Sequence, residues 1–159
     1  MNAENKQQLY DGVFQRVKDL IAGETDPIAV MATVACELHH SFDHFDWTGF
    51  YRVVAPGLLK IGPYQGTHGC LTIPFERGVC GAAARLRQTQ VVPDVREFSG
   101  YIACSSSSLS EIVVPVIASD GTLLAVLDVD SDRLAAFDEV DRVNLEEICS
   151  MVAAVHLRG

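Results

Sequence analysis

The strongest constraint on the fold of this chain is a pair of apolar segments that flank Asp120-Gly121. Residues 111–119 and 122–131 are rich in valine, isoleucine and leucine, and each has the length of a β-strand. Asp-Gly is a preferred two-residue hairpin loop because both central positions of that turn need a positive φ. The sequence therefore predicts a strongly apolar antiparallel hairpin.

This hairpin would gather three carboxylates, which we call the acid cluster: Glu111, Asp128 and Asp130. With a two-residue loop, Glu111 lies opposite Asp130 and Val113 opposite Asp128, so the three acids share one face. Their mutual repulsion raises each pKa unless a metal ion, an Arg or Lys, or a substrate ammonium compensates. A three-residue loop with a bulge would break this register, and Pro115 lacks an N–H for the ladder. In the alternative interpretation, the acids simply lie in solvent at the strand ends.

The remaining chain alternates between helical and strand patterns. Asp26 and Asp138 are the expected N-caps of the second and last long helices. We expect one domain over 1–159, with N-terminal helices in 1–44, the sheet and active-site loops in 45–131, and a C-terminal helix in 138–158. The other predicted elements are helices at 5–22, 27–40 and 78–86, and strands at 45–54, 58–64, 71–73 and 90–92.

Composition excludes several classes of function. A formal net charge of −9 argues against binding to nucleic acid or to an anionic membrane. No apolar run reaches the roughly 18 residues of a membrane-spanning helix, and the first residues do not resemble a signal peptide, so we expect a cytoplasmic protein. His40 and His44 have a spacing that can bind metal, but no ligand set surrounds them, and a polar helix end is the preferred interpretation. Cys36 is interpreted as a small buried hydrophobe and Cys149 as structural.

Three of the five cysteines fall in loop-forming segments. Cys80 is expected in the first turn of a helix, where the helix dipole, Arg77 and Arg85 would favour a thiolate. Cys104 precedes a run of four serines in a long loop, and Cys70 precedes a short strand. Thiols that meet in space suggest a nucleophile with resolving partners. The alternative is a set of unrelated small buried cysteines.

Trp47 and Tyr51 share one face of the strand predicted at 45–54. An aromatic pair two positions apart can belong to the core, or it can form the wall of a small-molecule pocket. The sequence alone leaves both interpretations open.

An ordered set of motifs runs from about residue 46 to the C-terminus and includes three of the cysteines. The motifs are Asp46-Trp47-Thr48-Gly49-Phe50-Tyr51, Gly62-Pro63-Tyr64-Gln65-Gly66, residues 70–81, Ile102-Ala103-Cys104, Ser110-Glu111-Ile112-Val113 and residues 121–131. Taken together, they resemble the GAF-domain free methionine-(R)-sulfoxide reductases.

The resemblance implies an α+β, GAF-like fold. Its central antiparallel sheet has about six strands, with the N- and C-terminal helices on one face and a loop-covered ligand pocket on the other. It implies reduction of free L-methionine (R)-sulfoxide, with thioredoxin as electron donor and without a cofactor or metal. It also implies a homodimer.

The same resemblance assigns roles to individual residues. It makes Cys104 the nucleophile, Cys70 its resolving partner and Cys80 a relay or second resolving thiol. It places Trp47 and Tyr51 around the methyl sulfoxide. The acid cluster would then bind the ammonium group of the substrate and supply the proton donor.

Some alternatives remain at this stage. The helix-end argument keeps Cys80 as an alternative nucleophile. Tyr101 replaces the family's usual histidine, and serines at 105–108 replace its usual Asp or Asn. The competing functions are a GAF domain that senses a small ligand and a protein that binds a divalent metal through the acid cluster.

Overall fold

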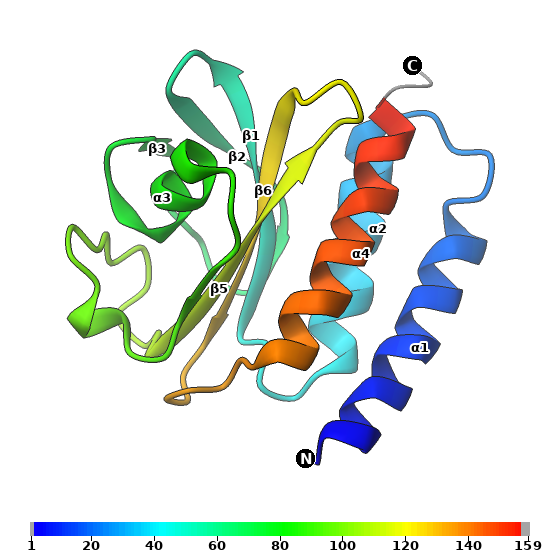
Figure 1. The fold of residues 1–159 in the computed structure, drawn as a ribbon, viewed down its shortest axis with the longest axis horizontal. Coiled ribbons are helices and arrows are strands. Elements are labelled where there is room, and N and C mark those ends of the chain that lie inside the picture. The colour runs from blue at the N-terminus through cyan, green and yellow to red at the C-terminus, as the bar shows by residue number, and fades with distance from the viewer. Residues whose placement is uncertain (1, 157–159) are drawn as a thin grey trace.

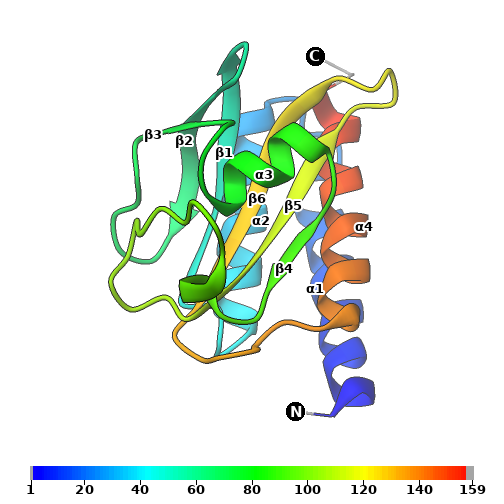
Figure 2. The same cartoon turned by 60° about the vertical axis from the view of Figure 1, so that its left-hand side comes forward.

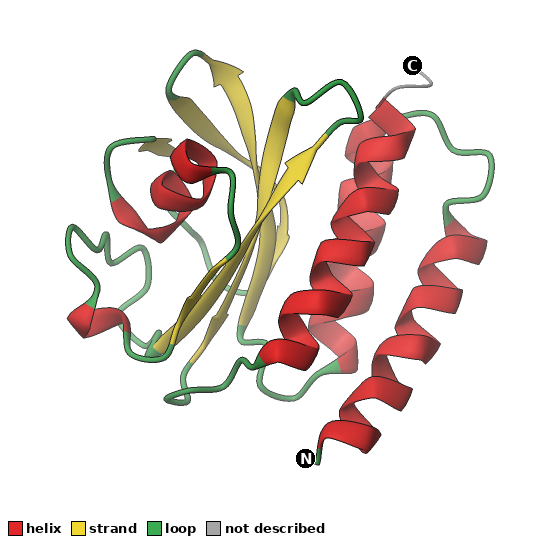
Figure 3. Ribbon diagram, viewed as in Figure 1, coloured by secondary structure: helices red, strands yellow, loops and turns green. Residues whose placement is uncertain are grey.

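A computed structural model describes residues 2–156 as a six-stranded antiparallel sheet with helices on both faces (Figures 1 and 3). The strand order is β3-β2-β1-β6-β5-β4, which confirms the predicted α+β architecture. The strands are β1 (Trp47–Ala55), β2 (Leu58–Gln65), β3 (Thr72–Pro74), β4 (Gln90–Val92), β5 (Ser110–Ile117) and β6 (Leu123–Ser131). The helices are α1 (Ala3–Leu20), α2 (Pro27–Ser41), α3 (Gly78–Leu86), the 3-10 turn η1 (Val95–Glu97) and α4 (Glu139–His156).

The helices divide between the two faces of the sheet. α2 packs on β1 and β2, α4 packs on β5, and α1 lies outside both, as Figure 1 shows. Figure 2 shows α3 lying across the opposite face, together with the loops around it. The predicted end of α4, near residues 157 and 158, lies outside the described residues.

Side-chain alternation along the strands creates two separate apolar layers. Phe50, Ile112 and Leu127 point to the long helices and belong to the larger layer. Tyr51 and Val113 point to α3 and belong to the smaller one. Because period-two alternation assigns neighbouring residues to opposite faces, the acid cluster faces the smaller layer.

The turn between β5 and β6 differs from the predicted two-residue loop. The Ala118 N–H donates to the Thr122 carbonyl over 2.9 Å, which leaves residues 119–121 as a three-residue loop. Gly121 has a φ of 86°, the left-handed conformation that ends loops of this length. The predicted two-residue loop is therefore wrong, and the loop is one residue longer than predicted.

A bulge next to this loop restores the predicted register. Val116 pairs with Ala125, but Ile117 pairs with Leu123, so Leu124 is an extra residue on β6. The bulge offsets the longer loop, and from Val116 back to the strand ends the pairing is the predicted one. Glu111–Asp130 and Val113–Asp128 are thus opposite each other, as the sequence indicated.

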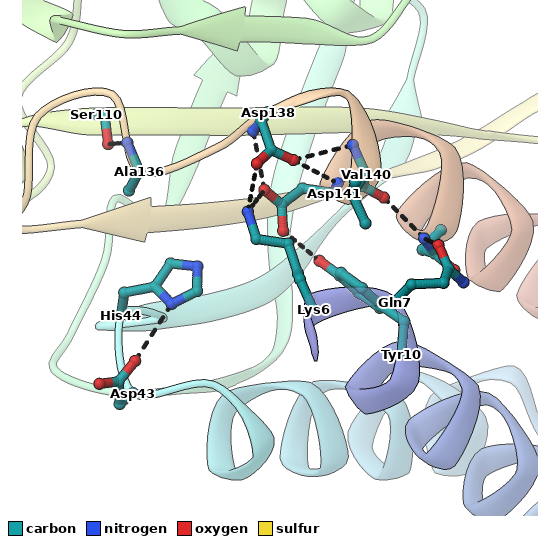
Figure 4. Close-up of polar contacts among 11 residues, drawn as sticks. Lys6, Gln7, Tyr10, Asp43, His44, Ser110, Ala136, Asp138, Val140 and Asp141 are labelled. Atoms are coloured by element: carbon teal, nitrogen blue, oxygen red, sulfur yellow. Dashed lines mark hydrogen bonds and ion pairs between the residues drawn. The ribbon is translucent and has the colours of Figure 1, made fainter. Parts of the chain in front are cut away.

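A partly buried ion-pair network fixes α1 to α4, and we call it the lysine cluster: Lys6, Tyr10, Asp138 and Asp141 (Figure 4). The Lys6 ammonium lies 2.7 Å from Asp141 Oδ2 and 2.8 Å from Asp138 Oδ2. The Tyr10 hydroxyl donates to Asp141 Oδ1 over 2.8 Å. Asp138 also caps α4, as predicted, by accepting from the Val140 N–H over 2.9 Å.

Candidate active site

A pocket opens on the sheet face that the three long helices leave free. β1 supplies its aromatic residues, α3 supplies Cys80, and the loop before β5 supplies Tyr101 and Cys104. The strand ends of β5 and β6 supply the acid cluster. Most of the residues that the sequence assigned to a site therefore line one cavity.

Cys70 and Cys104 form a disulfide, with an S–S distance of 2.01 Å and a sequence separation of 34 residues. The bond connects the loop before β3 to the serine-rich loop before β5. Both cysteines are partly buried, and Cys104 lines the pocket. The pairing implied by the resemblance is present. It excludes the interpretation that Cys70 and Cys104 are unrelated buried cysteines.

Cys80 lies in the first turn of α3, as predicted, but the expectation of an accessible thiolate is wrong. Its side chain is buried, and burial raises the pKa of the thiol well above its ordinary value, with further increases from Asp128 and Glu111. The two arginines do not oppose this effect. Arg77 is exposed, and the Arg85 guanidinium donates to the Phe75 carbonyl. Cys80 is therefore a neutral thiol.

Cys36 and Cys149, the two cysteines expected to be structural, have different surroundings. Cys149 is buried against the larger apolar layer on α4. Cys36 is only partly buried, with its sulfur 3.8 Å from His40 Nδ1, so the interpretation of a buried small hydrophobe is wrong there. Neither cysteine lines the pocket.

In the pocket, Glu111 and Asp128 are buried and Asp130 is partly buried, so the interpretation that the acid cluster lies in solvent is wrong. Burial raises the pKa of Glu111 well above its usual value, and the charges of Asp128 and Asp130 add to the effect. Burial also raises the pKa of Asp128, to about 6, although hydrogen bonds from Glu111 and Cys80 oppose the increase. The pKa of Asp130 is likewise raised by burial and by the Asp128 charge. None of the described residues lining the pocket is a Lys or Arg.

Hydrogen bonds link the members of the cluster. Those that Asp128 makes with Glu111 and Cys80 lower the pKa of Asp128 and raise the pKa values of its two partners, so they favour Asp128 as the acceptor of both. Asp128 Oδ1 is buried and has no hydrogen-bond partner among residues 2–156. The Ser108 hydroxyl donates to Asp130. The cluster consequently presents a negative charge and a free acceptor to whatever occupies the pocket.

Trp47 and Tyr51 are both core residues and pocket walls, so the two interpretations left open by the sequence hold together. They are 5% and 1% exposed, and their ring centroids lie 5.8 Å apart. The Trp47 indole N–H donates to the Thr67 carbonyl over 2.7 Å, which fixes the orientation of the ring. A Cβ at Gly69 would lie 2.9 Å from the Tyr51 hydroxyl, so this position requires glycine.

Sequence reasoning missed part of the pocket lining. His68, Gly69 and Ile102 line the pocket beside the predicted residues. Tyr101, noted only as a departure, also lines it, and burial together with the acid cluster raises the pKa of its hydroxyl. These residues could have been found from the sequence, because residues 68–69 directly precede Cys70 and residues 101–102 lie close before Cys104.

Comparison with known proteins identifies the class of this fold. Residues 24–155 match the family described as GAF domain. A GAF domain-containing protein A from Dictyostelium discoideum is 42% identical over 148 residues, covering 93% of this chain and 92% of that protein. The fold is thus that of a GAF domain.

Two further comparisons narrow the class. A crystal structure of the free methionine-R-sulfoxide reductase from Neisseria meningitidis, in complex with its substrate, has 43% identity and a TM-score of 0.90, covering 96% of this chain and 90% of that one. The free methionine-R-sulfoxide reductase of Escherichia coli is 35% identical and covers 95% of this chain and 90% of its own length. The chain belongs to the GAF-domain free methionine-R-sulfoxide reductases. Within residues 2–156, no helix has the length and apolarity to span a membrane.

Proposed function

We propose that this protein reduces free L-methionine (R)-sulfoxide to L-methionine and that thioredoxin returns its disulfide to the dithiol form. The observation that carries the proposal is the Cys70–Cys104 disulfide beside a pocket that contains buried, uncompensated carboxylates. The first feature supports thiol redox chemistry. The second supports a substrate with a positive charge.

Cys104 is the proposed nucleophile. In the dithiol form its thiolate attacks the sulfoxide sulfur, the oxygen passes to Cys104, methionine leaves, and a sulfenic acid remains. Cys70 then attacks this sulfenic acid, water leaves, and the observed disulfide forms. The dithiol of thioredoxin reduces that bond by exchange. The raised pKa of Cys80 supports Cys104 over Cys80 and leaves Cys80 as a relay or second resolving thiol.

Glu111 is the proposed proton donor to the sulfoxide oxygen. Its raised pKa favours the protonated form, which is the state that a general acid needs. Asp128, with a pKa of about 6, is mostly ionised at the same pH and accepts the substrate ammonium on its free Oδ1, with Asp130 beside it. A methionine within a peptide chain lacks this ammonium, so the cluster selects the free amino acid. Trp47 and Tyr51 hold the methyl sulfoxide end.

The test is a coupled assay that follows NADPH consumption with thioredoxin, thioredoxin reductase and methionine sulfoxide. We expect turnover with the free R form, none with the free S form, and a large loss with N-acetyl-methionine (R)-sulfoxide, whose amine carries no charge. Absence of turnover with the free R form, combined with saturable binding of another small ligand, would favour a sensor instead.

A single-turnover experiment without thioredoxin tests the roles of the thiols. We expect Cys104→Ser to release no methionine, whereas Cys70→Ser releases one equivalent and then stops. Cys149→Ser is the matched control, because this buried thiol lies outside the pocket. If Cys80→Ser abolishes the first turnover and Cys104→Ser does not, the assignment of the nucleophile is wrong. Cytoplasmic location and homodimerisation stay predictions.

A further inference from the structure

We propose that Cys80, Glu111 and Asp128 form a Zn²⁺ site inside the pocket. Each residue offers one ligand atom, and the three atoms all lie within 4.8 Å of one another. They come from three different elements, α3, β5 and β6, and all three side chains are buried. One thiolate and two carboxylates form a mixed sulfur and oxygen set, which suits Zn²⁺ better than Mg²⁺ or Ca²⁺.

A second observation points to a cation at this place. Asp128 is only 5% exposed, and its Oδ1 atom has no hydrogen-bond partner among residues 2–156. A buried carboxylate oxygen without a donor is costly unless a ligand meets it. None of the described side chains lining the pocket is a Lys or Arg that would compensate the charge.

The disulfide leaves this site intact. Cys70 and Cys104 are bonded to each other, so Cys80 is the free thiol among the described pocket residues. On binding, the ion replaces the protons of the Cys80 thiol and of Glu111, and both protons are released. Three protein ligands leave a fourth tetrahedral position for water or for a group from the pocket.

The position of the ion has a consequence for catalysis, which rests on the proposed function. A Zn²⁺ ion on Asp128 occupies the place proposed for the substrate ammonium, and it converts the thiol of Cys80 to a bound thiolate. The disulfide form with bound Zn²⁺ is therefore a resting form that excludes the amino acid. Binding to the disulfide form can be measured without turnover, so the metal site and the proposed activity can fail separately.

Co²⁺ is the probe for the first experiment, because a thiolate ligand gives Co²⁺ a charge-transfer absorption in the near ultraviolet. We expect the disulfide form to develop this absorption at one Co²⁺ per chain and Zn²⁺ to abolish it. Cys80→Ser should remove the absorption. Cys149→Ser and Cys36→Ser should keep it, and Cys36 is the stringent control because its sulfur lies 3.8 Å from His40 Nδ1.

The carboxylate variants make the proposal falsifiable even if Cys80→Ser does not fold. Glu111→Gln and Asp128→Asn should keep the absorption at saturating Co²⁺ but weaken binding by about tenfold or more, since even residues that only support a ligand have effects of that size. The proposal is overturned if no absorption develops in the disulfide form. It is equally overturned if the absorption depends on Cys36, or if both carboxylate variants bind Co²⁺ as tightly as the parent protein.

Discussion

The molecule contains two groups of acids with buried members, and the two groups differ in whether a cation of the chain compensates their charge. In the lysine cluster, Asp138 and Asp141 share the ammonium of Lys6 (Figure 4). In the acid cluster, Glu111, Asp128 and Asp130 lie together. None of the described residues that line the pocket around them is a Lys or Arg. The two groups lie on opposite sides of the sheet, one between α1 and the start of α4 and the other beside α3.

The pKa values follow this difference. Burial alone would lower the pKa of Lys6 and raise that of Asp138, but their mutual hydrogen bonds and charges reverse both effects. In the acid cluster burial dominates, and every carboxyl pKa is raised. The lysine cluster is therefore complete within the chain and stabilises the fold. The acid cluster costs stability, and under the proposed function it is the ammonium group of the substrate that compensates its charge.

The sharpest way to test this comparison is Glu111→Gln. The amide keeps the size of the side chain but cannot donate an acidic proton, so we expect kcat/KM for free methionine (R)-sulfoxide to fall by about 10²- to 10⁴-fold. Exposed Glu147→Gln is the matched control and should have parent activity. Parent activity in Glu111→Gln at neutral pH would remove Glu111 from its role as proton donor.

Lys6→Met should produce the second largest effect, on stability and not on chemistry. Without the Lys6 ammonium, the fully buried Asp141 has no cation. We expect the free energy of unfolding to fall by about 3–5 kcal/mol. Chemical denaturation at pH 7 measures the change. Lys18→Met, at an exposed position of the same helix, should have little effect. Adding Asp141→Asn to Lys6→Met should recover part of the loss, whereas additive losses would show that the pair is not coupled.

The two clusters also differ in how far the sequence predicts them. The acid cluster follows from local strand pairing, and its register was predicted even though the loop was not, because the bulge at Leu124 compensates for the extra loop residue. The lysine cluster joins residues more than 130 positions apart and was missed. A signal was present, since Lys6 continues the helical stripe of Val13 and Val17 and is buried with them.

The error at Cys80 has a related physical cause. Position in a helix can be predicted from sequence, and the helix dipole and two arginines near Cys80 indicated a thiolate. Tertiary packing then buries the thiol and places it next to Asp128 and Glu111, and this outweighs the dipole. The fold and the strand register were thus accessible from the sequence, whereas the protonation states depend on side chains brought together by folding.

Asp128→Asn should stabilise the protein, in the direction opposite to Lys6→Met. The folded-state pKa of Asp128 is raised to about 6, so the parent protein loses stability as the pH rises from about 4 to about 6 and does not regain it above that range. Asparagine does not titrate, and its amide oxygen still accepts hydrogen bonds. We expect a gain of about 1–3 kcal/mol at pH 8 and almost none at pH 3. A variant less stable than the parent at pH 8 would contradict the view that the cluster is uncompensated.

Asp138→Asn should have the smallest effect, and its pH dependence should be the reverse. The lowered pKa of Asp138 means that its contribution is present above about pH 4 and is lost as the pH falls. Because 54% of this side chain is exposed and asparagine still caps a helix, we expect a loss of only about 0.5–1 kcal/mol at pH 7. Thermal unfolding at pH 7 and pH 3 would measure it, with Asp138→Ala as the variant that also loses the cap. A loss that persists at pH 3 would trace the effect to the cap and not to Lys6, so the charge compensation would then rest on Asp141 alone.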